Sequence, residues 1–210
     1  MIPSTLAISN RATQRGESLS DWARRLAAAG VEALQIREKD LSDLEIYRLV
    51  AELTALSGMP SVLVNERLDL AIAAGATGIH LRSDSVPLRS VRLRCPDLLI
   101  GKSAHSLAEV RTARDDGVDY VTLSPIFAPL SKKTDDWPPL GLANLEAAAR
   151  LGLPILALGG ICREQLANLA HAGAAGFAGI TIFQRPHELA EVLEEAWQLW
   201  PRALTSCAVP

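Results

Sequence analysis

Short apolar runs alternate with longer Ala- and Leu-rich amphipathic runs along the chain, and this alternation limits the fold more than any other feature. The apolar runs, each as long as a buried strand, are residues 6–9, 33–36, 61–64, 78–81, 98–101, 120–123, 154–157 and 176–179. Helical patterns occupy residues 18–29, 42–57, 68–74, 88–94, 107–116, 142–151, 163–172 and 188–199. Strands that alternate with helices form parallel βα units. Eight such units predict an α/β protein, a compact (β/α)8 TIM barrel, and a doubly wound open sheet is the alternative.

The boundaries of the helical patterns carry suitable residues. Ser18, Ser42 and Ser106 stand where an N-cap is expected, and a glycine follows several helix ends. Segments 74–78 and 172–176 both begin Ala-Gly-Ala, and each leads from a helix into a strand. At 210 residues the chain is near the compact limit for a (β/α)8 barrel. We therefore expect residues 1–210 to form a single barrel domain.

Charge, hydropathy and cysteine spacing exclude several classes of protein. The net charge is −3, with 21 Lys and Arg against 24 Asp and Glu, so no basic excess indicates a nucleic-acid partner. The apolar runs fall far short of the roughly 18 residues that a membrane span needs, and residues 1–16 lack a signal-peptide pattern. Cys95, Cys162 and Cys207 show no CxxC or Cys/His metal spacing. These features predict a cytoplasmic protein with reduced thiols, and they leave open whether it forms a homo-oligomer.

Polar residues follow the second apolar run at the point where its strand would end. In (β/α)8 barrels the active site lies at the carboxyl ends of the strands. Gln35 lies inside the run, and Arg37 and Lys39 come just after it. A strand that ends in Arg-x-Lys places both cations on one face, because side chains alternate with period two. Two such cations suit a phosphate or diphosphate ligand, and a solvated loop is the alternative.

Glycines and a threonine follow the last two strands. Gly159 and Gly160 come after the seventh apolar run, and Thr181 comes after the eighth. Glycines before a helix let backbone N–H groups approach a phosphate. The phosphate site of a (β/α)8 barrel is often built from the loops after strands seven and eight. These residues therefore indicate a phosphate site, with a plain tight turn as the alternative.

Two carboxylates at strand ends are candidate ligands for Mg²⁺. Glu66 follows the third apolar run and Asp84 follows the fourth. Mg²⁺ is usually held by hard oxygen ligands together with substrate phosphates. Each carboxylate has an alternative role at a helix start, where the helix dipole stabilises it. Nearby, His80 either points into the barrel or stacks on a ligand, and His105 stands next to a helix start.

In the order and spacing of its motifs, the chain resembles the thiamine phosphate synthase and thiazole tautomerase family, a compact (β/α)8 group. The resemblance runs over nearly the whole chain, from Leu6 to Ile182. The matching segments are residues 35–40 (QIREKD), 64–71 (VNERLDLA), 78–81 (GIHL), 100–105 (IGKSAH), 125–127 (PIF), 131–132 (SK), 139–142 (PLGL), 158–161 (LGGI) and 172–176 (AGAAG). Each segment alone is weak, but their order and spacing together are highly specific.

The resemblance to the synthase implies a transferase that joins hydroxymethylpyrimidine diphosphate to thiazole phosphate, giving thiamine phosphate and pyrophosphate. It implies that Gln35 contacts the pyrimidine. The residues implied to hold the diphosphate are Arg37, Lys39, Asn65, Ser103 and Lys132. Ser131 stands in place of the usual Thr and is implied to bind substrate as well. The three cations among them, Arg37, Lys39 and Lys132, are implied to be catalytic. Gly160 and Thr181 are implied to hold the thiazole phosphate. The implied route is dissociative: the diphosphate leaves and the thiazole nitrogen captures the resulting cation.

The chain departs from the synthase pattern where that family holds its metal. Glu66 and Ser85 stand at positions where synthases usually carry Asp ligands for Mg²⁺, and Asp84 lies one place before Ser85. Arg82 replaces a Gly. The resemblance implies Mg²⁺ as the cofactor, with Glu66 and Asp84 as its ligands in this chain.

Two alternative functions follow from these departures. One is a thiazole tautomerase-like enzyme, although the catalytic His of that group falls at Pro125 here and its second-strand motif usually lacks Gln35. The other is a non-catalytic paralogue that binds thiazole phosphate or thiamine phosphate.

Overall fold

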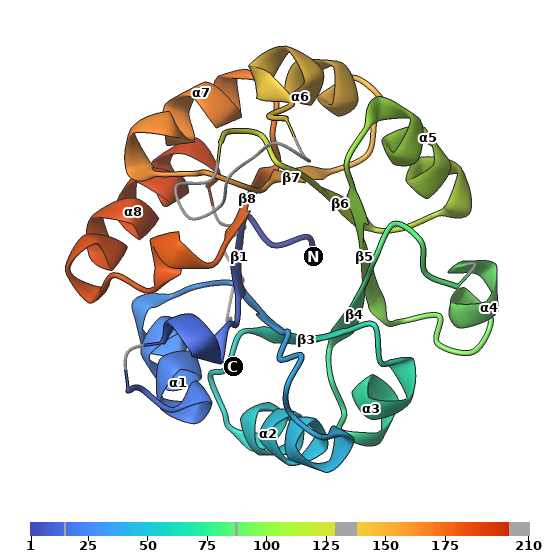
Figure 1. Cartoon of the computed structure of the whole chain (residues 1–210), viewed down its shortest axis with the longest axis vertical. Coiled ribbons are helices and arrows are strands. Elements are labelled where there is room, and N and C mark those ends of the chain that lie inside the picture. The colour runs from blue at the N-terminus through green and yellow to red at the C-terminus, as the bar shows by residue number, and fades with distance from the viewer. Residues whose placement is uncertain (15, 87, 129–137, 202–210) are drawn as a thin grey trace, which may run out of the picture.

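The computed structural model describes residues 1–14, 16–86, 88–128 and 138–201. Eight parallel strands close into a barrel, in which each strand pairs with the next and β8 pairs with β1 (Figure 1). The strands are β1 (Thr5–Ile8), β2 (Ala33–Ile36), β3 (Ser61–Asn65), β4 (Gly78–Leu81), β5 (Leu99–Ala104), β6 (Tyr120–Leu123), β7 (Ile155–Ala157) and β8 (Gly176–Gly179). The (β/α)8 barrel predicted from the sequence is confirmed, and the open sheet is excluded.

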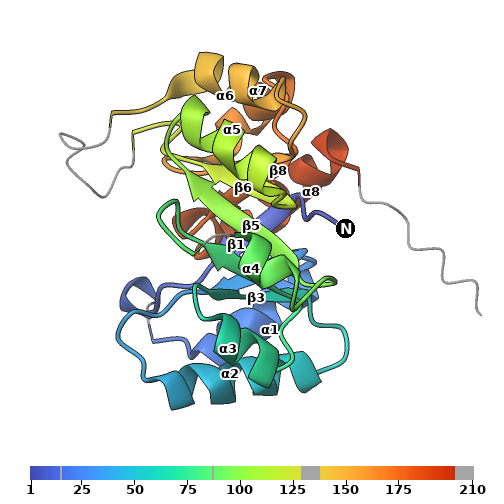
Figure 2. The same ribbon diagram turned by 90° about the vertical axis from the view of Figure 1, so that its right-hand side faces the viewer.

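The helices surround the barrel as an outer ring (Figures 1 and 2). The α-helices are α1 (Leu19–Ala29), α2 (Asp43–Ala55), α3 (Leu68–Ala73), α4 (Leu88–Arg92), α5 (Leu107–Asp116), α6 (Gly141–Ala149), α7 (Leu166–His171) and α8 (Pro186–Leu199). Three short 3₁₀ turns are η1 (Arg11–Thr13), η2 (Arg163–Gln165) and η3 (Thr181–Phe183). Among the described residues, no helix is long and apolar enough to cross a membrane.

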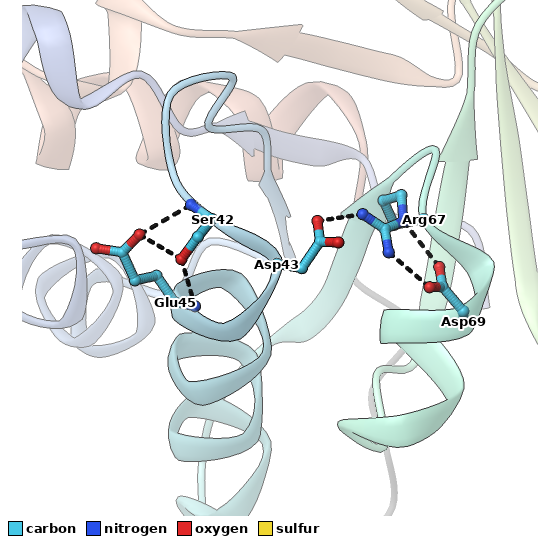
Figure 3. Close-up of polar contacts among 5 residues, drawn as sticks. All are labelled: Ser42, Asp43, Glu45, Arg67 and Asp69. Atoms are coloured by element: carbon cyan, nitrogen blue, oxygen red, sulfur yellow. Dashed lines mark hydrogen bonds and ion pairs between the residues drawn. The ribbon is translucent and has the colours of Figure 1, made fainter.

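Serine N-caps fix the starts of three helices, as the sequence predicts. The hydroxyls of Ser18, Ser42 and Ser106 each accept a hydrogen bond from the backbone N–H three residues ahead. At Ser42 the Glu45 carboxylate also accepts the Ser42 backbone N–H, which completes a capping box (Figure 3). The caps satisfy backbone donors that the first helical turn leaves unpaired, so each helix begins at a defined point after its strand.

Strand β5 runs three residues further than the apolar run predicts, because Lys102 and Ser103 belong to the strand itself. Lys102 therefore does not lie at the strand end with the other polar residues. Its ammonium group lies 3.3 Å from the Asp116 carboxylate at the end of α5, on the outside of the barrel. Ser103, on the opposite face of the same strand, points into the barrel.

The core has two layers, one inside the barrel and one between strands and helices. The inner layer is built from alternate strand residues: Leu6, Ile8, Ala33, Leu63, Tyr120, Leu156 and Ala178. Ile2 packs against this inner cluster, and the N-terminus projects onto the barrel axis in Figure 1. The barrel interior is thus filled by side chains, and the N-terminal segment covers the end from which the strands start.

Candidate active site

An amide pair, buried at Gln35 and half-buried at Asn65, lies where β2 and β3 end. Gln35 is 2% exposed, and its Nε2 atom donates a hydrogen bond to Asn65 Oδ1 at 2.9 Å. The other amide atom of Gln35, Oε1, is buried without a hydrogen-bond partner among the described residues. A buried acceptor that stays unsatisfied costs free energy. The pair therefore offers an acceptor to a donor on a ligand, and both residues are among those predicted from the sequence.

A second set of hydrogen-bonded polar side chains lies inside the barrel, with His80 on β4 at its centre. Its Nδ1 atom lies 3.1 Å from the Tyr120 hydroxyl. Its Nε2 atom lies 3.1 Å from Ser103 Oγ and 3.2 Å from Thr122 Oγ1. Asn65 pairs with His80 in the β3–β4 register, so this group adjoins the Gln35 pair. Ser103 is thereby positioned by a buried histidine.

The His80 imidazole is neutral at physiological pH. Burial, and secondarily the positive charge of Arg37, lower the pKa of His80 from 6.5 to about 4. A histidine with this pKa acts as a fixed hydrogen-bond group and carries no positive charge for an anion.

Tyr120 and Thr122 are site residues that the sequence analysis missed. Both lie on β6 and are fully buried. The signal was available, since residues two apart on a strand share a face, and Tyr120, Thr122 and Ser124 alternate with apolar residues. Polar residues at the strand ends alone do not reveal these two side chains, because both lie deeper in the strand.

Arg37 and Lys39 lie in the loop beyond β2. The strand ends at Ile36, so strand alternation does not place the two cations on one face. Arg37 is half-buried and its backbone N–H donates to Ser9 Oγ at 2.8 Å. Lys39 is exposed. The structure thus half-buries Arg37 and ties its backbone to the buried Ser9, whereas Lys39 is exposed.

The loop after β2 is pinned to the loop after β1. The buried Glu38 carboxylate accepts the Arg11 backbone N–H at 3.1–3.2 Å. The Arg11 guanidinium pairs with Asp40 at 2.6 Å, and this hydrogen-bonded pair lowers the pKa of Asp40. Both carboxylates of this loop, Glu38 and Asp40, are therefore paired with Arg11, whereas no described ion pair engages Arg37 or Lys39.

The turn after β7 requires glycine. Gly159 and Gly160 have φ values of +95° and +64°, a region that favours residues without a side chain. A Cβ on Gly160 would come within 2.6 Å of the carbonyl oxygens of Phe127 and Ala128. Within the described chain neither amide N–H donates to a backbone oxygen. The turn is therefore tight, and its two N–H groups have no backbone acceptor among the described residues, which is compatible with a phosphate site. Thr181 is exposed at the start of η3.

The two predicted metal ligands are both engaged by Arg82. Its backbone N–H donates to Glu66 Oε1 at 2.5 Å, and its guanidinium binds both Asp84 oxygens at 2.7–2.9 Å. In the described part of the chain, no group of three or more His, Cys, Asp or Glu could hold a metal ion. With Ser85 at the other ligand position, the residues present do not fit a Mg²⁺ site as they are arranged. Ser131 and Lys132 lie outside the described residues.

Comparison with known proteins identifies the family of the chain. The model of the thiamine monophosphate synthase family matches residues 5–183. A putative thiamine-phosphate synthase 2 of Aquifex aeolicus is 39% identical over 188 residues, covering 87% of this chain and 98% of that relative. A thiamine-phosphate synthase of Methanoculleus marisnigri is 41% identical over 172 residues, covering 80% of this chain and 81% of the relative.

A solved structure shows the same arrangement of the chain. The thiamine phosphate pyrophosphorylase of Pyrococcus furiosus superposes with a TM-score of 0.79 at 25% identity, covering 92% of this chain and 96% of that one. The similarity therefore extends over the barrel and includes the strands that carry Gln35, Asn65 and Ser103.

Proposed function

Because the chain belongs to the thiamine monophosphate synthase family, we propose that it joins hydroxymethylpyrimidine diphosphate to thiazole phosphate, which gives thiamine phosphate and pyrophosphate. The observation that carries the proposal is the unsatisfied Oε1 of the buried Gln35. An aminopyrimidine presents an N–H donor to such an acceptor, whereas a purely apolar ligand would leave it unsatisfied. Gln35, held by Asn65, thus selects the pyrimidine.

Charge stabilisation on the leaving group is the main demand of this reaction. The bond between the pyrimidine methylene carbon and the diphosphate oxygen breaks, and the electron pair leaves with the diphosphate. The thiazole nitrogen then donates its lone pair to the methylene carbon, and no proton has to be abstracted. Such a step depends on oriented cations and donors. Arg37 and Lys39, with Lys132, supply the proposed charges, and the Ser103 hydroxyl adds a donor.

The second substrate is proposed to bind above the turn after β7. The N–H groups of Gly159 and Gly160 are available there, and Thr181 adds an exposed hydroxyl. Backbone N–H groups at a strand-to-helix turn bind phosphate well. A thiazole phosphate held there keeps its ring nitrogen toward the pyrimidine. No step of the reaction is assigned to Mg²⁺, since Arg82 occupies both Glu66 and Asp84.

The two alternative functions are less well supported. The relatives reported above carry the synthase name, which favours the transferase over a tautomerase-like or binding-only paralogue. Pro125 also stands where the tautomerase histidine would be expected. We further propose a cytoplasmic location, in line with the reduced cysteines expected from the sequence.

Incubation of the purified protein with both substrates tests the proposal. Thiamine phosphate and pyrophosphate should appear in equal amounts. Gln35→Met should lower kcat/KM about ten- to hundredfold, the cost of one buried hydrogen bond to substrate. The matched control is Gln198→Met on the exposed face of α8, which should leave kcat/KM unchanged. Absence of thiamine phosphate beside an active control synthase would reject the assignment.

A further inference from the structure

Arg82 bridges the two carboxylates at the rim between β3 and β4. Besides the backbone hydrogen bond, its Nε lies 3.9 Å from Glu66 Oε2. Its Nε and Nη2 atoms hold Asp84 in a bidentate pair at 2.7–2.9 Å. One guanidinium thus contacts both of the carboxylates that follow these strands.

The turn that presents Glu66 is built for this contact. Glu66 has φ of +65°, a left-handed conformation that is uncommon for a residue other than glycine. Its backbone N–H donates to the His80 carbonyl at 3.0 Å, which ties the turn to β4. Arg82 is the first residue after β4, so the strand that fixes the turn leads directly into the cation.

The neighbouring cation is occupied elsewhere. Arg67, next to Glu66 in the chain, pairs with Asp43 at the start of α2 and with Asp69 at the start of α3 (Figure 3). Those two carboxylates hold its guanidinium between the helices. Within the described residues, Arg82 is therefore the side chain that pairs with Glu66.

The charges around Arg82 oppose binding of a divalent ion. The guanidinium places its positive charge directly against Asp84 through charge-assisted hydrogen bonds. Ser85 adds no charge. Mg²⁺ needs free carboxylate oxygens in octahedral geometry, whereas the bidentate pair uses both oxygens of Asp84. An Arg fork matches a carboxylate in this way and cannot lose its proton.

We propose that Arg82 is the resident cation of this rim, standing at Glu66 and Asp84 in place of a divalent metal. The consequence for catalysis rests on the proposed synthase function: the diphosphate is held by arginine and lysine charges, without a metal bound to these two carboxylates.

Binding of Mn²⁺ alone, followed by electron paramagnetic resonance, tests the proposal without turnover. The wild-type protein should bind Mn²⁺ weakly. Arg82→Gln removes the guanidinium from both carboxylates and leaves only the backbone hydrogen bond to Glu66, so it should tighten Mn²⁺ binding about tenfold or more, the effect of removing one charge a few ångströms from the ion. A second change, Asp84→Asn in the Arg82→Gln protein, should abolish the gain.

Arg150→Gln is the matched control, because Arg150 forms an exposed pair with Glu146 on α6. It should leave Mn²⁺ binding at the wild-type level. Arg82 is 62% exposed, so its replacement spares the core. Equal Mn²⁺ affinity in wild type and Arg82→Gln would overturn the proposal, and so would a gain that survives Asp84→Asn.

Pyrophosphate binding by calorimetry, in EDTA and in Mg²⁺, gives the second readout. Wild type should bind pyrophosphate in EDTA within about threefold of its affinity in Mg²⁺, whereas Arg82→Gln should lose about tenfold in EDTA and recover in Mg²⁺. Wild-type binding that disappears in EDTA would contradict the proposal. Tighter Mn²⁺ binding by Arg82→Gln, together with no thiamine phosphate formation by the wild-type protein, would reject the synthase function and leave the role of Arg82 standing.

Discussion

The Tyr120 hydroxyl lies 3.1 Å from His80 Nδ1, and this one contact fixes the tautomer of the buried imidazole. Tyr120 has no other acceptor among the described residues, and burial raises the pKa of its hydroxyl, so the O–H donates to Nδ1. The imidazole proton is then on Nε2, which donates to Ser103 and Thr122. Ser103 accepts from His80 and keeps its own O–H to donate, which is the polarity that an anionic ligand requires.

His80 should make stability depend on pH. Its pKa of about 4 in the folded protein lies below the ordinary value of 6.5, so as the pH falls the unfolded chain gains a proton first. The free energy of unfolding should therefore decrease between about pH 6.5 and pH 4, by at most about 1.4 kcal/mol per pH unit from this group.

Urea unfolding at several pH values in that window measures the effect. His80→Asn should be destabilised at pH 7 and should show a shallower loss of stability toward pH 4 than wild type. His187→Asn, an exposed position on α8, should keep the wild-type slope. Parallel slopes for wild type and His80→Asn would contradict a buried, neutral His80.

Gly101→Ala should destabilise the protein by about 2 kcal/mol or more, because overpacking a core forces side chains to move. A Cβ on Gly101 would overlap the Tyr120 ring and come within 2.6 Å of His80 Nδ1. Gly152→Ala is the control, with φ of +77° and open space around it, and should cost only about 1 kcal/mol of backbone strain. Urea denaturation compares the two, and equal losses would show that the Tyr120–His80 contact does not need the glycine.

Gly160→Ala should weaken binding of thiazole phosphate about tenfold or more and affect pyrophosphate much less. The added Cβ would collide with the Phe127 and Ala128 carbonyl groups and displace the turn that offers its N–H groups. Gly141→Ala, with φ of +73° and no atom nearby, serves as the control. Calorimetry with each ligand separates the two sites, and equal losses for both would argue against a phosphate site at this turn.

Ser42→Ala should lower the free energy of unfolding by about 1 kcal/mol, since it removes the hydroxyl of a capping box at α2. Helix α2 follows the loop that carries Arg37 and Lys39. A less stable helix start should hold this loop less firmly, and KM should therefore rise. Ser57→Ala, an exposed turn position, should change neither quantity. Urea denaturation and steady-state kinetics of the two variants provide the comparison.

The barrel was predictable from the sequence because its signal is local. Eight apolar runs with helices between them determine the topology, and Ser18, Ser42 and Ser106 mark helix starts through contacts within three residues. The strand β5 boundary was less accessible, because Lys102 looks like a loop residue. Its charge is tolerated in the strand only because Asp116, fourteen residues later, lies beside it.

The sequence predicted which residues form the candidate site, but it predicted much less well which side chains they contact. Gln35, Asn65 and Ser103 were identified by resemblance to a family, but the partner of each depends on barrel register and on side-chain rotamers. Arg82 shows the limit most clearly. The sequence reveals an arginine where the family has glycine, and only the folded loop shows that its guanidinium meets both expected metal ligands.

The position of the N-terminal segment at one end of the barrel determines from which end a ligand can enter. With Ile2 packed against the inner cluster, the described N-terminal segment covers the end from which the strands start, so we expect a ligand to reach Gln35 from the carboxyl ends of the strands. A ligand that binds at this depth must enter before a ligand that binds nearer the rim. Exchange through a single entrance predicts an ordered kinetic scheme, in which the pyrimidine substrate binds before the thiazole.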